Sequence, residues 1–396
     1  MTIKTPIRSG YVGLLIIALL VAACGGEGDD QFEPTQTPDQ ETSTTPSDTS
    51  SNPADGESDD PAAAAGDEMT LPGRGVSVTV ARGNWSTGYM QAAIYAALLT
   101  ELGYEVSRPA DLELPPSNAY VAMARGEFDF WANSWFPNHK QFLVAEMQDG
   151  TLVAEHLSVL GWEMRTGGLQ GVLTNKSLVD DYGIETLDQI VNDPDLFAIY
   201  DGGDTTPDDG VLQLLGCPEG WGCHITINAW IENAGWTAVD QLKVGSYDVL
   251  IAEAVSRDSA GVPYIVYSWA PSSYVADLRP GDNAVWLSTS DQSISPSQVE
   301  GAASLGEGQC SADPCNLGWD AADIRVTANN DFLAANPAAA RLFELVVISP
   351  VDVALQNVAY SLGEDTEQDI DRHAADWLSV NRDTVDRWLT AARNAG

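Results

Sequence analysis

The sequence has few basic residues. Among its 396 residues, 18 Lys and Arg stand against 58 Asp and Glu, so the formal net charge is −40. Nucleic acids and anionic lipid surfaces both bind proteins through basic patches. The shortage of positive charge therefore argues against both classes of partner. Adaptation to a salty habitat is a second explanation of the acidic composition, which we keep as a hypothesis.

Signatures of catalysis and of metal binding are missing as well. The four histidines are scattered, and there is no nucleophile elbow, no glycine-rich phosphate loop and no His-Glu-x-x-His motif. An acidic run with Asp201, Asp204, Asp208 and Asp209 lacks the ligand spacing and the terminal glutamate of a calcium loop. We interpret this run as a solvated loop rather than a metal site, and we expect no enzymatic activity and no cofactor.

A long hydrophobic run is also missing. The apolar stretch at 11–21 is shorter than the about 20 residues that span a bilayer. Lys4 and Arg8 precede it and Ala22-Ala23-Cys24-Gly25 ends it, which is the layout of a secretion signal. The cysteine after Ala-Ala resembles the bacterial lipobox. We predict that residues 1–23 are removed and that a lipidated Cys24 anchors an extracytoplasmic protein to the cell membrane; a plain signal peptide or a short anchor is the alternative.

Residues 24–68 contain almost no large apolar side chains. Gly, Ser, Thr, Pro, Asp and Glu dominate this stretch, so it cannot bury enough surface to offset the entropy of ordering the chain. We predict a disordered acidic tether behind the lipidated cysteine.

Cysteine is scarce, with five residues in the chain. An extracytoplasmic location favours disulfides, and Cys24 accounts for the odd cysteine. Two local bonds are the favoured one of three connectivities, because each pair flanks a short loop: Cys217 with Cys223, and Cys310 with Cys315. A four-cysteine zinc site is the alternative, although the first gap is wider than zinc sites use.

Residues 69–396 show alternating strand and helix patterns that predict two α/β lobes. Residues 76–80 alternate as a strand, and Ser86 is positioned to cap a helix whose apolar residues recur at helical spacing until Gly103. Residues 104–107 then form the next strand. Such a βαβ unit requires a parallel sheet.

A short motif occurs twice, as Asn133-Ser134-Trp135-Phe136-Pro137 and as Tyr267-Ser268-Trp269-Ala270-Pro271. Each copy follows a helix, a turn and a strand, predicted at 118–125 and 128–132 for the first copy and at 247–256 and 264–267 for the second. Ligands of α/β sheets bind beyond the carboxyl ends of strands. We therefore expect both tryptophans to face a cleft between two pseudo-symmetric lobes.

The order of these patterns predicts a discontinuous first lobe. The chain is expected to cross near Gly167-Gly168 and to return near 286–288, so that lobe 1 contains 69–165 and 288–396 and lobe 2 contains 166–287. A turn-rich segment at 291–319 follows the return. Four terminal helices are predicted, starting at Pro337 and at Pro350 and then covering 366–379 and 382–393.

Four segments together resemble the glycine betaine/proline betaine substrate-binding proteins of ABC importers: Gly220-Trp221-Gly222-Cys223 with a cysteine six residues before its end, the second tryptophan motif, 281–287 and 336–343. The resemblance covers nearly all of residues 75–394. It implies a periplasmic-binding-protein fold of type II, whose two lobes close on a quaternary ammonium compound and deliver it to a membrane permease.

The same resemblance implies a binding site. The family's tryptophan box falls on Trp135, Trp221 and Trp269, with its histidine on His139. The backbone N–H groups of Gly222 and Cys223 would hold the ligand's carboxylate, helped by His139 or the Trp221 indole, and a Cys217–Cys223 disulfide would fix that loop.

The residue types suit such a ligand. A trimethylammonium group has no N–H to donate, whereas an indole face attracts its diffuse charge and buries its methyl groups. A glycine-flanked loop lets main-chain donors approach a carboxylate. We read the loop positions of Trp135, Trp221 and Trp269 as ligand contacts and leave Trp85, which ends the first strand, undecided. The others are read as core: Trp131, Trp162, Trp230, Trp236, Trp286, Trp319, Trp377 and Trp388.

The sequence therefore predicts a monomeric extracytoplasmic binding protein that passes glycine betaine or a related osmoprotectant to an ABC permease and ATPase. A lipid-anchored sensor for choline- or carnitine-type ligands is the alternative, and a secreted hydrolase of choline or betaine esters is a weaker one. The segment Ser272-Ser273-Tyr274 departs from the family, where another aromatic often follows the proline, so the identity of the betaine stays open. The loop between Cys310 and Cys315 has no role in this prediction.

Overall fold

A computed structural model describes residues 71–290, 301–302 and 304–396. The chain divides into two units, Met1–Met69 and Thr70–Gly396, and the fold described below is that of the second unit. The predictions of a signal peptide at 1–23, a lipidated Cys24 and a tether at 24–68 lie outside the described residues, as does part of the turn-rich segment at 291–319. In the part that is described, no helix is long and apolar enough to cross a membrane.

The expected βαβ unit opens the fold. Strands β1 (Ser77–Val78) and β2 (Val80–Gly83) precede helix α1 (Tyr89–Glu101), and β3 (Glu105–Val106) pairs with β1 in parallel. The prediction that Ser86 caps the helix is wrong. Ser86 instead begins the short 3-10 helix η2 (Ser86–Gly88), and α1 follows it without a side-chain cap.

Strand β5 (Phe130–Phe136) is buried along its whole length and runs parallel to β2. It follows η3 (Pro109–Asp111), β4 (Glu113–Leu114) and α2 (Pro116–Ala124). The strand starts and ends later than the predicted range of 128–132, so it contains Trp135. The expectation that Trp135 lies in a loop is therefore wrong: Trp135 is the last residue but one of a buried strand, and Ile324 of β11 pairs with it.

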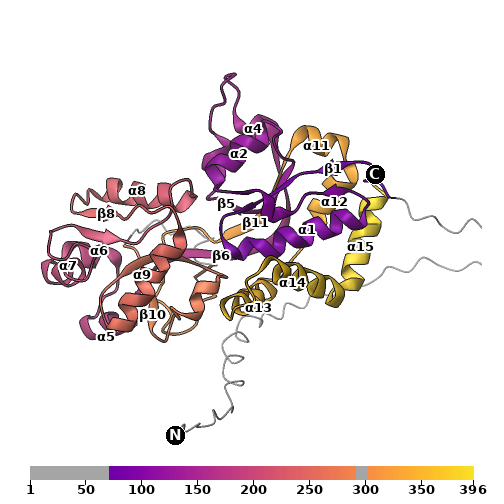
Figure 1. The fold of residues 1–396 in the computed structure, drawn as a ribbon. Coiled ribbons are helices and arrows are strands. Elements are labelled where there is room, and N and C mark those ends of the chain that lie inside the picture. Colours follow the sequence, from indigo (N-terminus) through magenta and orange to yellow (C-terminus); the bar gives the residue numbers. More distant parts are fainter. Residues whose placement is uncertain (1–70, 291–300, 303) are drawn as a thin grey trace, which may run out of the picture. The chain divides into compact units, whose positions relative to one another are not determined.

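Strand β6 (Leu157–Asn175) is 19 residues long and joins the two parts of the fold (Figure 1). The first part contains the elements before β6 and those from β11 onward, and the second part contains the elements from α5 to β10. Up to Gly168 it pairs with β11 (Ala322–Asn329), and from Leu169 onward with β9 (Ile265–Ala270). The change of partner coincides with the predicted crossing at Gly167-Gly168. The predicted crossing therefore falls inside one continuous strand.

The sheet order is β10-β6-β11-β5-β2-β4, with β9 paired to β6. Strands β9 and β10 (Ala284–Leu287) run antiparallel to β6, and β11 runs antiparallel to both β5 and β6. Within this sheet, the parallel arrangement expected from the βαβ patterns therefore holds only for the strands before β6. Trp269 lies within β9, so the expectation of a loop position is wrong for this tryptophan too.

The rest of the second part packs around β9 and β10. Its elements are α5 (Lys176–Tyr182), α6 (Leu187–Asn192), α7 (Pro194–Asp201), the parallel pair β7 (Leu212–Leu214) and β8 (Val239–Gln241), α8 (Gly222–Ala234), α9 (Tyr247–Ala260) and η4 (Ser273–Ala276). Two short helices, α3 (Lys140–Leu143) and α4 (Val153–His156), lie between β5 and β6.

The predicted terminal helices are confirmed. They are α12 (Pro337–Leu345), α13 (Pro350–Ser361), α14 (Glu367–Val380) and α15 (Arg382–Arg393), preceded by the short α11 (Asn330–Ala335). A proline occupies the first position of α12 and of α13, where its missing N–H costs nothing. Helices α14 and α15 pack against α1 (Figure 1), so the C-terminal segment completes the first part of the fold.

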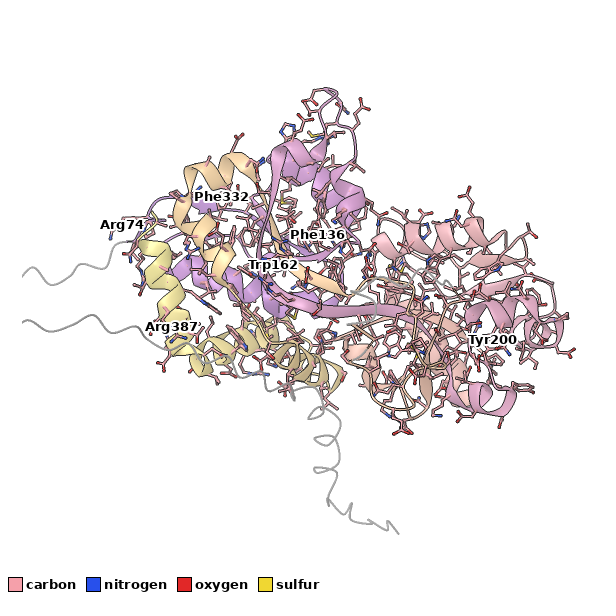
Figure 2. The ribbon with its side chains drawn as sticks, turned by 180° about the vertical axis from the view of Figure 1, so that it is seen from behind. Arg74, Phe136, Trp162, Tyr200, Phe332 and Arg387 are labelled. Atoms are coloured by element: carbon pink, nitrogen blue, oxygen red, sulfur yellow. A yellow bond between two sulfur atoms is a disulfide. The ribbon has the colours of Figure 1, made fainter. Side chains whose placement is uncertain are left out.

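Most of the tryptophans read as core are buried or half-buried, but Trp162 is not. Its side chain is 38% exposed on β6. The Arg325 and Arg165 guanidinium carbons lie 4.1 and 4.4 Å from the centre of its ring. Two cations thus cover part of this partly exposed ring, whose position is labelled in Figure 2. The core reading of Trp162 is therefore wrong.

Candidate functional site

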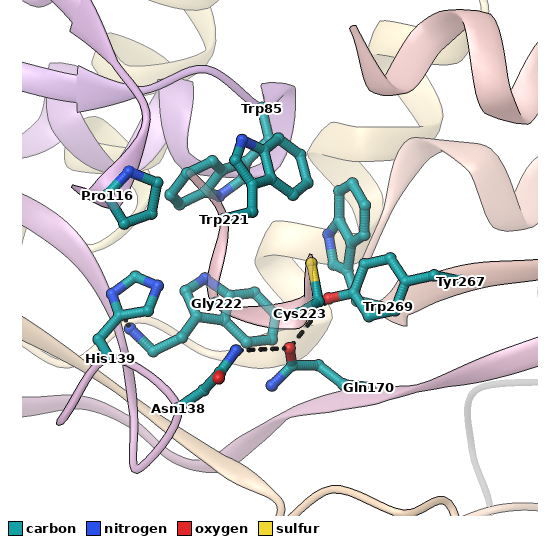
Figure 3. A pocket seen from close by; sticks show the side chains of 11 residues that line it. Trp85, Pro116, Asn138, His139, Gln170, Trp221, Gly222, Cys223, Tyr267 and Trp269 are labelled. Carbon is teal, nitrogen blue, oxygen red and sulfur yellow. Dashed lines mark hydrogen bonds between the residues drawn. The ribbon is translucent and has the colours of Figure 1, made fainter. Parts of the chain in front are cut away.

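A pocket lies between the two parts of the fold (Figure 3); the space not filled by atoms there is about 330 Å³, which includes space open to solvent. Its walls come from segments that are far apart in the sequence, from the residue before η2 to β9. None of the eleven lining residues is Asp, Glu, Lys or Arg. They are Trp85, Pro116, Trp135, Asn138, His139, Gln170, Trp221, Gly222, Cys223, Tyr267 and Trp269.

All six residues that the sequence predicts for a ligand site line this pocket. Trp135 comes from the end of β5, Trp269 from the end of β9, and Trp221 directly precedes α8. The rings of Trp221 and Trp269 meet at 68° with their centres 5.7 Å apart. In both copies of the duplicated motif the peptide bond before the proline is cis, so the copies share backbone geometry as well as sequence.

Trp85 is a fourth tryptophan of the pocket that sequence reasoning left undecided. Its ring centre lies 5.2 Å from that of Trp221, at an interplanar angle of 70°. The ring lies over Gly83, where an added Cβ would come within 2.5 Å of it. The sequence signal for a ligand contact was the place of Trp85 at the end of the first predicted strand. The absence of a side chain at Gly83 permits the close approach of the indole ring to the backbone.

Two tyrosines support the tryptophans. Tyr247 stacks on Trp221 with ring centres 5.8 Å apart and lies 4.7 Å from Trp269, and Tyr267 lies 6.0 Å from Trp269. Tyr267 opens the second copy of the duplicated motif, but sequence reasoning named only the tryptophan. An aromatic cluster of this density leaves the rings little freedom to rotate.

The indole N–H groups of the four tryptophans are all used within the protein. Those of Trp85 and Trp135 both donate to Asn133 Oδ1 at 2.8 Å. Trp221 donates to Asn84 Oδ1 at 2.8 Å, and Trp269 donates to Thr87 Oγ1 at 3.0 Å. The expectation that the Trp221 indole helps to hold a carboxylate is therefore not met. These tryptophans offer the pocket their faces and edges rather than a donor.

His139 is 4% exposed and is held in one tautomer. The backbone N–H of Trp135 donates to its Nδ1 at 3.2 Å, so Nδ1 is an acceptor and the ring proton resides on Nε2. The Tyr120 hydroxyl lies 3.2 Å from the same Nδ1. Burial lowers the pKa of His139 to about 3, so the ring is neutral and carries one N–H at Nε2.

Helix α8 begins at the pocket. Gly222 and Cys223 are its first two residues, and no side chain caps it. The first N–H groups of a helix have no partner inside the helix, and the helix dipole makes this end positive. An anionic group is therefore favoured here. The structure contains the Cys217–Cys223 disulfide at this end, and also the expected Cys310–Cys315 disulfide.

The pocket therefore combines two environments. Aromatic faces without any nearby carboxylate suit a cation that has methyl groups in place of N–H donors. The start of α8 and the His139 Nε2–H suit an anionic group. The arrangement fits a small zwitterion whose cation is quaternary.

The acidic run near α7 is only partly solvated. Asp208 and Asp209 are exposed, but Asp201 and Asp204 are buried. Asp201 accepts from the Gly210 N–H, and Asp204 accepts from the N–H groups of Thr206 and Gln213. These two carboxylates fold the loop, which corrects the reading of the whole run as solvated. Among the described residues, no group of three or more His, Cys, Asp or Glu is placed to hold a metal.

A model of one protein family matches residues 76–380, and that family is described as the substrate-binding domain of the ABC-type glycine betaine transport system. The glycine betaine-binding periplasmic protein OusX of Dickeya dadantii (strain 3937) is 32% identical over 326 residues, which cover 82% of this chain and 92% of OusX. The glycine betaine/proline betaine-binding periplasmic protein of Salmonella typhimurium (strain LT2) is 28% identical over 323 residues, 81% and 92% of the two chains.

Solved structures resemble the fold at lower identity. Lactococcal OpuAC in its closed conformation with glycine betaine superposes with a TM-score of 0.56 at 13% identity, covering 79% of this chain and 99% of that one. An ABC-transporter choline-binding protein in complex with choline gives a TM-score of 0.58 at 16% identity, covering 80% and 94%. These likenesses establish the two-lobed α/β fold of a periplasmic binding protein, which was expected from the sequence.

Proposed function

We propose a function from the premise that this chain belongs to the family of substrate-binding domains of ABC-type glycine betaine transport systems. It captures glycine betaine or a related quaternary ammonium osmoprotectant outside the cytoplasm and delivers it to an ABC permease. Its relatives are periplasmic proteins. The observation that carries the proposal is the pocket itself, where four tryptophans surround a space next to the start of α8.

The cation would be held by the rings. Because the indole N–H groups of Trp85, Trp135, Trp221 and Trp269 are tied to protein acceptors, the rings keep fixed positions toward a ligand. A desolvated cation–π contact contributes about 1–2 kcal/mol. Rings fixed beforehand lose little entropy when the ligand binds, which favours affinity.

The carboxylate would be held at the start of α8. The backbone N–H groups of Gly222 and Cys223 and the Nε2–H of the neutral His139 line the same pocket. Hydrogen bonds to a charged acceptor contribute about 1.5–3 kcal/mol each. The Cys217–Cys223 disulfide fixes the loop that leads into these donors.

The proposal includes the organisation of the whole protein. Cys24 is its lipid anchor, residues 24–68 are the tether, and the lobes are 69–165 with 288–396 and 166–287. The protein acts as a monomer that docks on its permease. A lipid-anchored sensor of choline- or carnitine-type ligands remains the alternative, and the family's description as part of a transport system favours delivery to a permease.

Calorimetric titration tests the binding step. The chain from residue 24 onward, with Cys24→Ser so that it stays unlipidated, is titrated with glycine betaine, proline betaine, choline and proline. We expect micromolar binding of at least one betaine, no binding of proline, and loss of betaine binding in Trp221→Ala. Trp162→Ala is the control, because this tryptophan lies outside the pocket and is partly exposed. Absence of heat with every ligand would refute the proposal.

A transport measurement separates delivery from sensing. Cells that carry the chain together with its cognate permease should accumulate radiolabelled glycine betaine, and cells with the Trp221→Ala chain should not. Binding without any chain-dependent uptake would favour the sensor instead.

A further inference from the structure

Gln170 lines the pocket, but it belongs neither to the tryptophan box nor to the start of α8, so its side-chain amide has no role in the site described above. Gln170 lies on β6 and is 3% exposed. We propose that its Nε2–H₂ group donates an additional hydrogen bond to the ligand's carboxylate. The pocket thereby selects quaternary ammonium ligands that carry a carboxylate over quaternary cations that lack a carboxylate. This inference rests on the proposed function.

The orientation of the Gln170 amide follows from its neighbours. Gln141 Nε2 lies within hydrogen-bond distance of two backbone carbonyl oxygens, Asn138 O at 2.9 Å and Gly222 O at 3.3 Å, so this atom must be the nitrogen. The same Nε2 donates to Asn138 Oδ1 at 3.1 Å. The other end of the Asn138 amide is therefore Nδ2, which donates to Gln170 Oε1 at 3.2 Å.

The Gln170 oxygen is thus fully engaged. Besides Asn138 Nδ2 it accepts from the Tyr267 hydroxyl at 2.9 Å (Figure 3). The amide nitrogen is therefore the end left over. Among the described residues Gln170 Nε2 has no hydrogen-bond partner although it is buried. A buried N–H₂ without an acceptor is unfavourable, and a ligand oxygen in this pocket would remove that penalty.

Gln170 also lies on the side of the pocket where the ligand's carboxylate is proposed to bind. The Asn138 side chain that bonds Gln170 touches the start of α8, since a Cβ added at Gly222 would lie 2.7 Å from its amide atoms. Gln170, on β6, therefore adjoins the donors proposed for the carboxylate. With Gly222, Cys223 and His139, Gln170 would complete a set of donors from α8, β6 and the residue before α3.

A purely structural role is the competing explanation, because Gln170 also orients Tyr267 through its oxygen. Two substitutions separate the roles. Gln170→Glu keeps the Oε1 acceptor for Tyr267 and Asn138 and replaces only the free N–H₂, whereas Gln170→Met removes both functions without adding charge. Gln189→Glu is the matched control: Gln189 lies on α6, outside the pocket, and its Oε1 accepts from the N–H of Glu185, which precedes the helix.

Each variant of the chain from residue 24 with Cys24→Ser is titrated with glycine betaine and with tetramethylammonium, which has the cation but no carboxylate. We expect the Kd for glycine betaine to rise at least tenfold in both Gln170 variants. The Kd for tetramethylammonium should change less than threefold in Gln170→Met and should stay equal or fall in Gln170→Glu, while Gln189→Glu matches the wild type for both ligands. Equal losses for both ligands, or an unchanged Kd ratio in Gln170→Met, would overturn the inference.

A measurement on the unmodified side chain covers the case in which a variant does not fold. In ¹⁵N-labelled protein, the Gln170 side-chain N–H₂ resonances should shift downfield with glycine betaine and not with tetramethylammonium. Identical shifts with both ligands count against the inference. Failure of the wild type to bind either ligand would instead refute the proposed function, so the two failures are distinguishable.

Discussion

Asn133 Oδ1 accepts the indole N–H of Trp135 at 2.8 Å, and the same oxygen accepts the indole N–H of Trp85 at 2.8 Å. One carbonyl oxygen with two lone pairs therefore orients two rings of the pocket. The Asn133 amide is itself fixed, because its Nδ2 donates to Gln91 Oε1 and Gln91 Nε2 donates to the Thr87 carbonyl at 3.1 Å. A buried polar chain behind the pocket thus sets the geometry of its aromatic wall.

Replacing Asn133 with Leu should disorganise this wall. Two buried indole N–H groups would lose their acceptor, at about 1–3 kcal/mol for each buried group left unpaired. We expect a lower free energy of unfolding in urea and at least a tenfold weaker binding of glycine betaine by calorimetry. Asn133→Asp, which keeps the acceptor for both indoles, should retain more affinity. Wild-type affinity in Asn133→Leu would show that the rings are held by packing alone.

Ligand binding should be insensitive to pH near neutrality. Because burial lowers the pKa of His139 to about 3, the ring stays a neutral donor from pH 8 down to pH 5. The Kd for glycine betaine should therefore change less than threefold over this range. An exposed histidine, with a pKa of about 6.5, would change its charge within it. A large change in Kd centred near pH 6.5 would contradict the buried neutral ring.

His139 should also make the stability of the folded protein depend on pH. Unfolded His139 takes up a proton below about pH 6.5, whereas the folded ring does so only near its lowered pKa of about 3. The unfolded state therefore binds more protons between these values, so stability falls as the pH drops from 6.5 toward 3. Urea unfolding of the wild type and of His139→Gln at pH 7, 5.5 and 4 should show a smaller loss in the variant.

Much of the site could be predicted from the sequence because its signals are local. The duplicated motif placed Trp135 and Trp269 at the ends of equivalent strands, and the Gly-Trp-Gly-Cys segment marked a loop with backbone donors for a ligand. Prolines marked the starts of α12 and α13. Each of these signals lies within a few neighbouring residues, so the arrangement of distant segments did not have to be known.

The remaining residues depend on distant parts of the chain. Strand β11 pairs with both β5 and β6, although more than a hundred residues separate it from either, and its sequence alone gives no such indication. Gln170 matters only because Asn138 and Tyr267 occupy its oxygen. Trp162 looked like core because tryptophans are usually buried, whereas two arginines cover it at the surface.

The two disulfides should differ in their effect on binding. Each closes a short loop, and a loop of this length contributes about 2 kcal/mol in the chain-entropy model. Replacing both cysteines with serine should therefore lower the free energy of unfolding for either pair. Only the Cys217/Cys223 pair adjoins the start of α8, so only its loss should weaken glycine betaine binding. The Cys310/Cys315 variant is the matched control, and equal losses of affinity would contradict the proposed role of the loop.

Glu163 should make the protein less stable as the pH rises. The side chain lies on β6 with 1% exposure, and neither carboxyl oxygen has a hydrogen-bond partner among the described residues. Burial raises its pKa well above the ordinary range, although the nearby Tyr95 hydroxyl partly offsets this effect. The unfolded carboxyl ionises near pH 4.3, so above that pH the folded state holds the extra proton. Stability from this group is complete below about pH 4.3 and is lost as the pH rises through the folded pKa.

Glu163→Gln removes this titration while keeping the shape of the side chain. At pH 7.5 we expect the variant to be more stable than the wild type, because the amide, unlike the carboxyl, needs no proton uptake on folding. The difference should grow by about 1.4 kcal/mol per pH unit above the unfolded pKa until the folded pKa is reached, and at pH 4 the two should unfold at nearly the same urea concentration. Glu364→Gln is a control of opposite sign, because hydrogen bonds from His373 and Arg372 lower the pKa of the exposed Glu364. Stability from Glu364 is present above its unfolded pKa and is lost as the pH falls, so that variant should be the less stable one at pH 7.5. A Glu163→Gln protein that is destabilised at every pH would mean that the buried carboxyl makes a hydrogen bond the amide cannot replace.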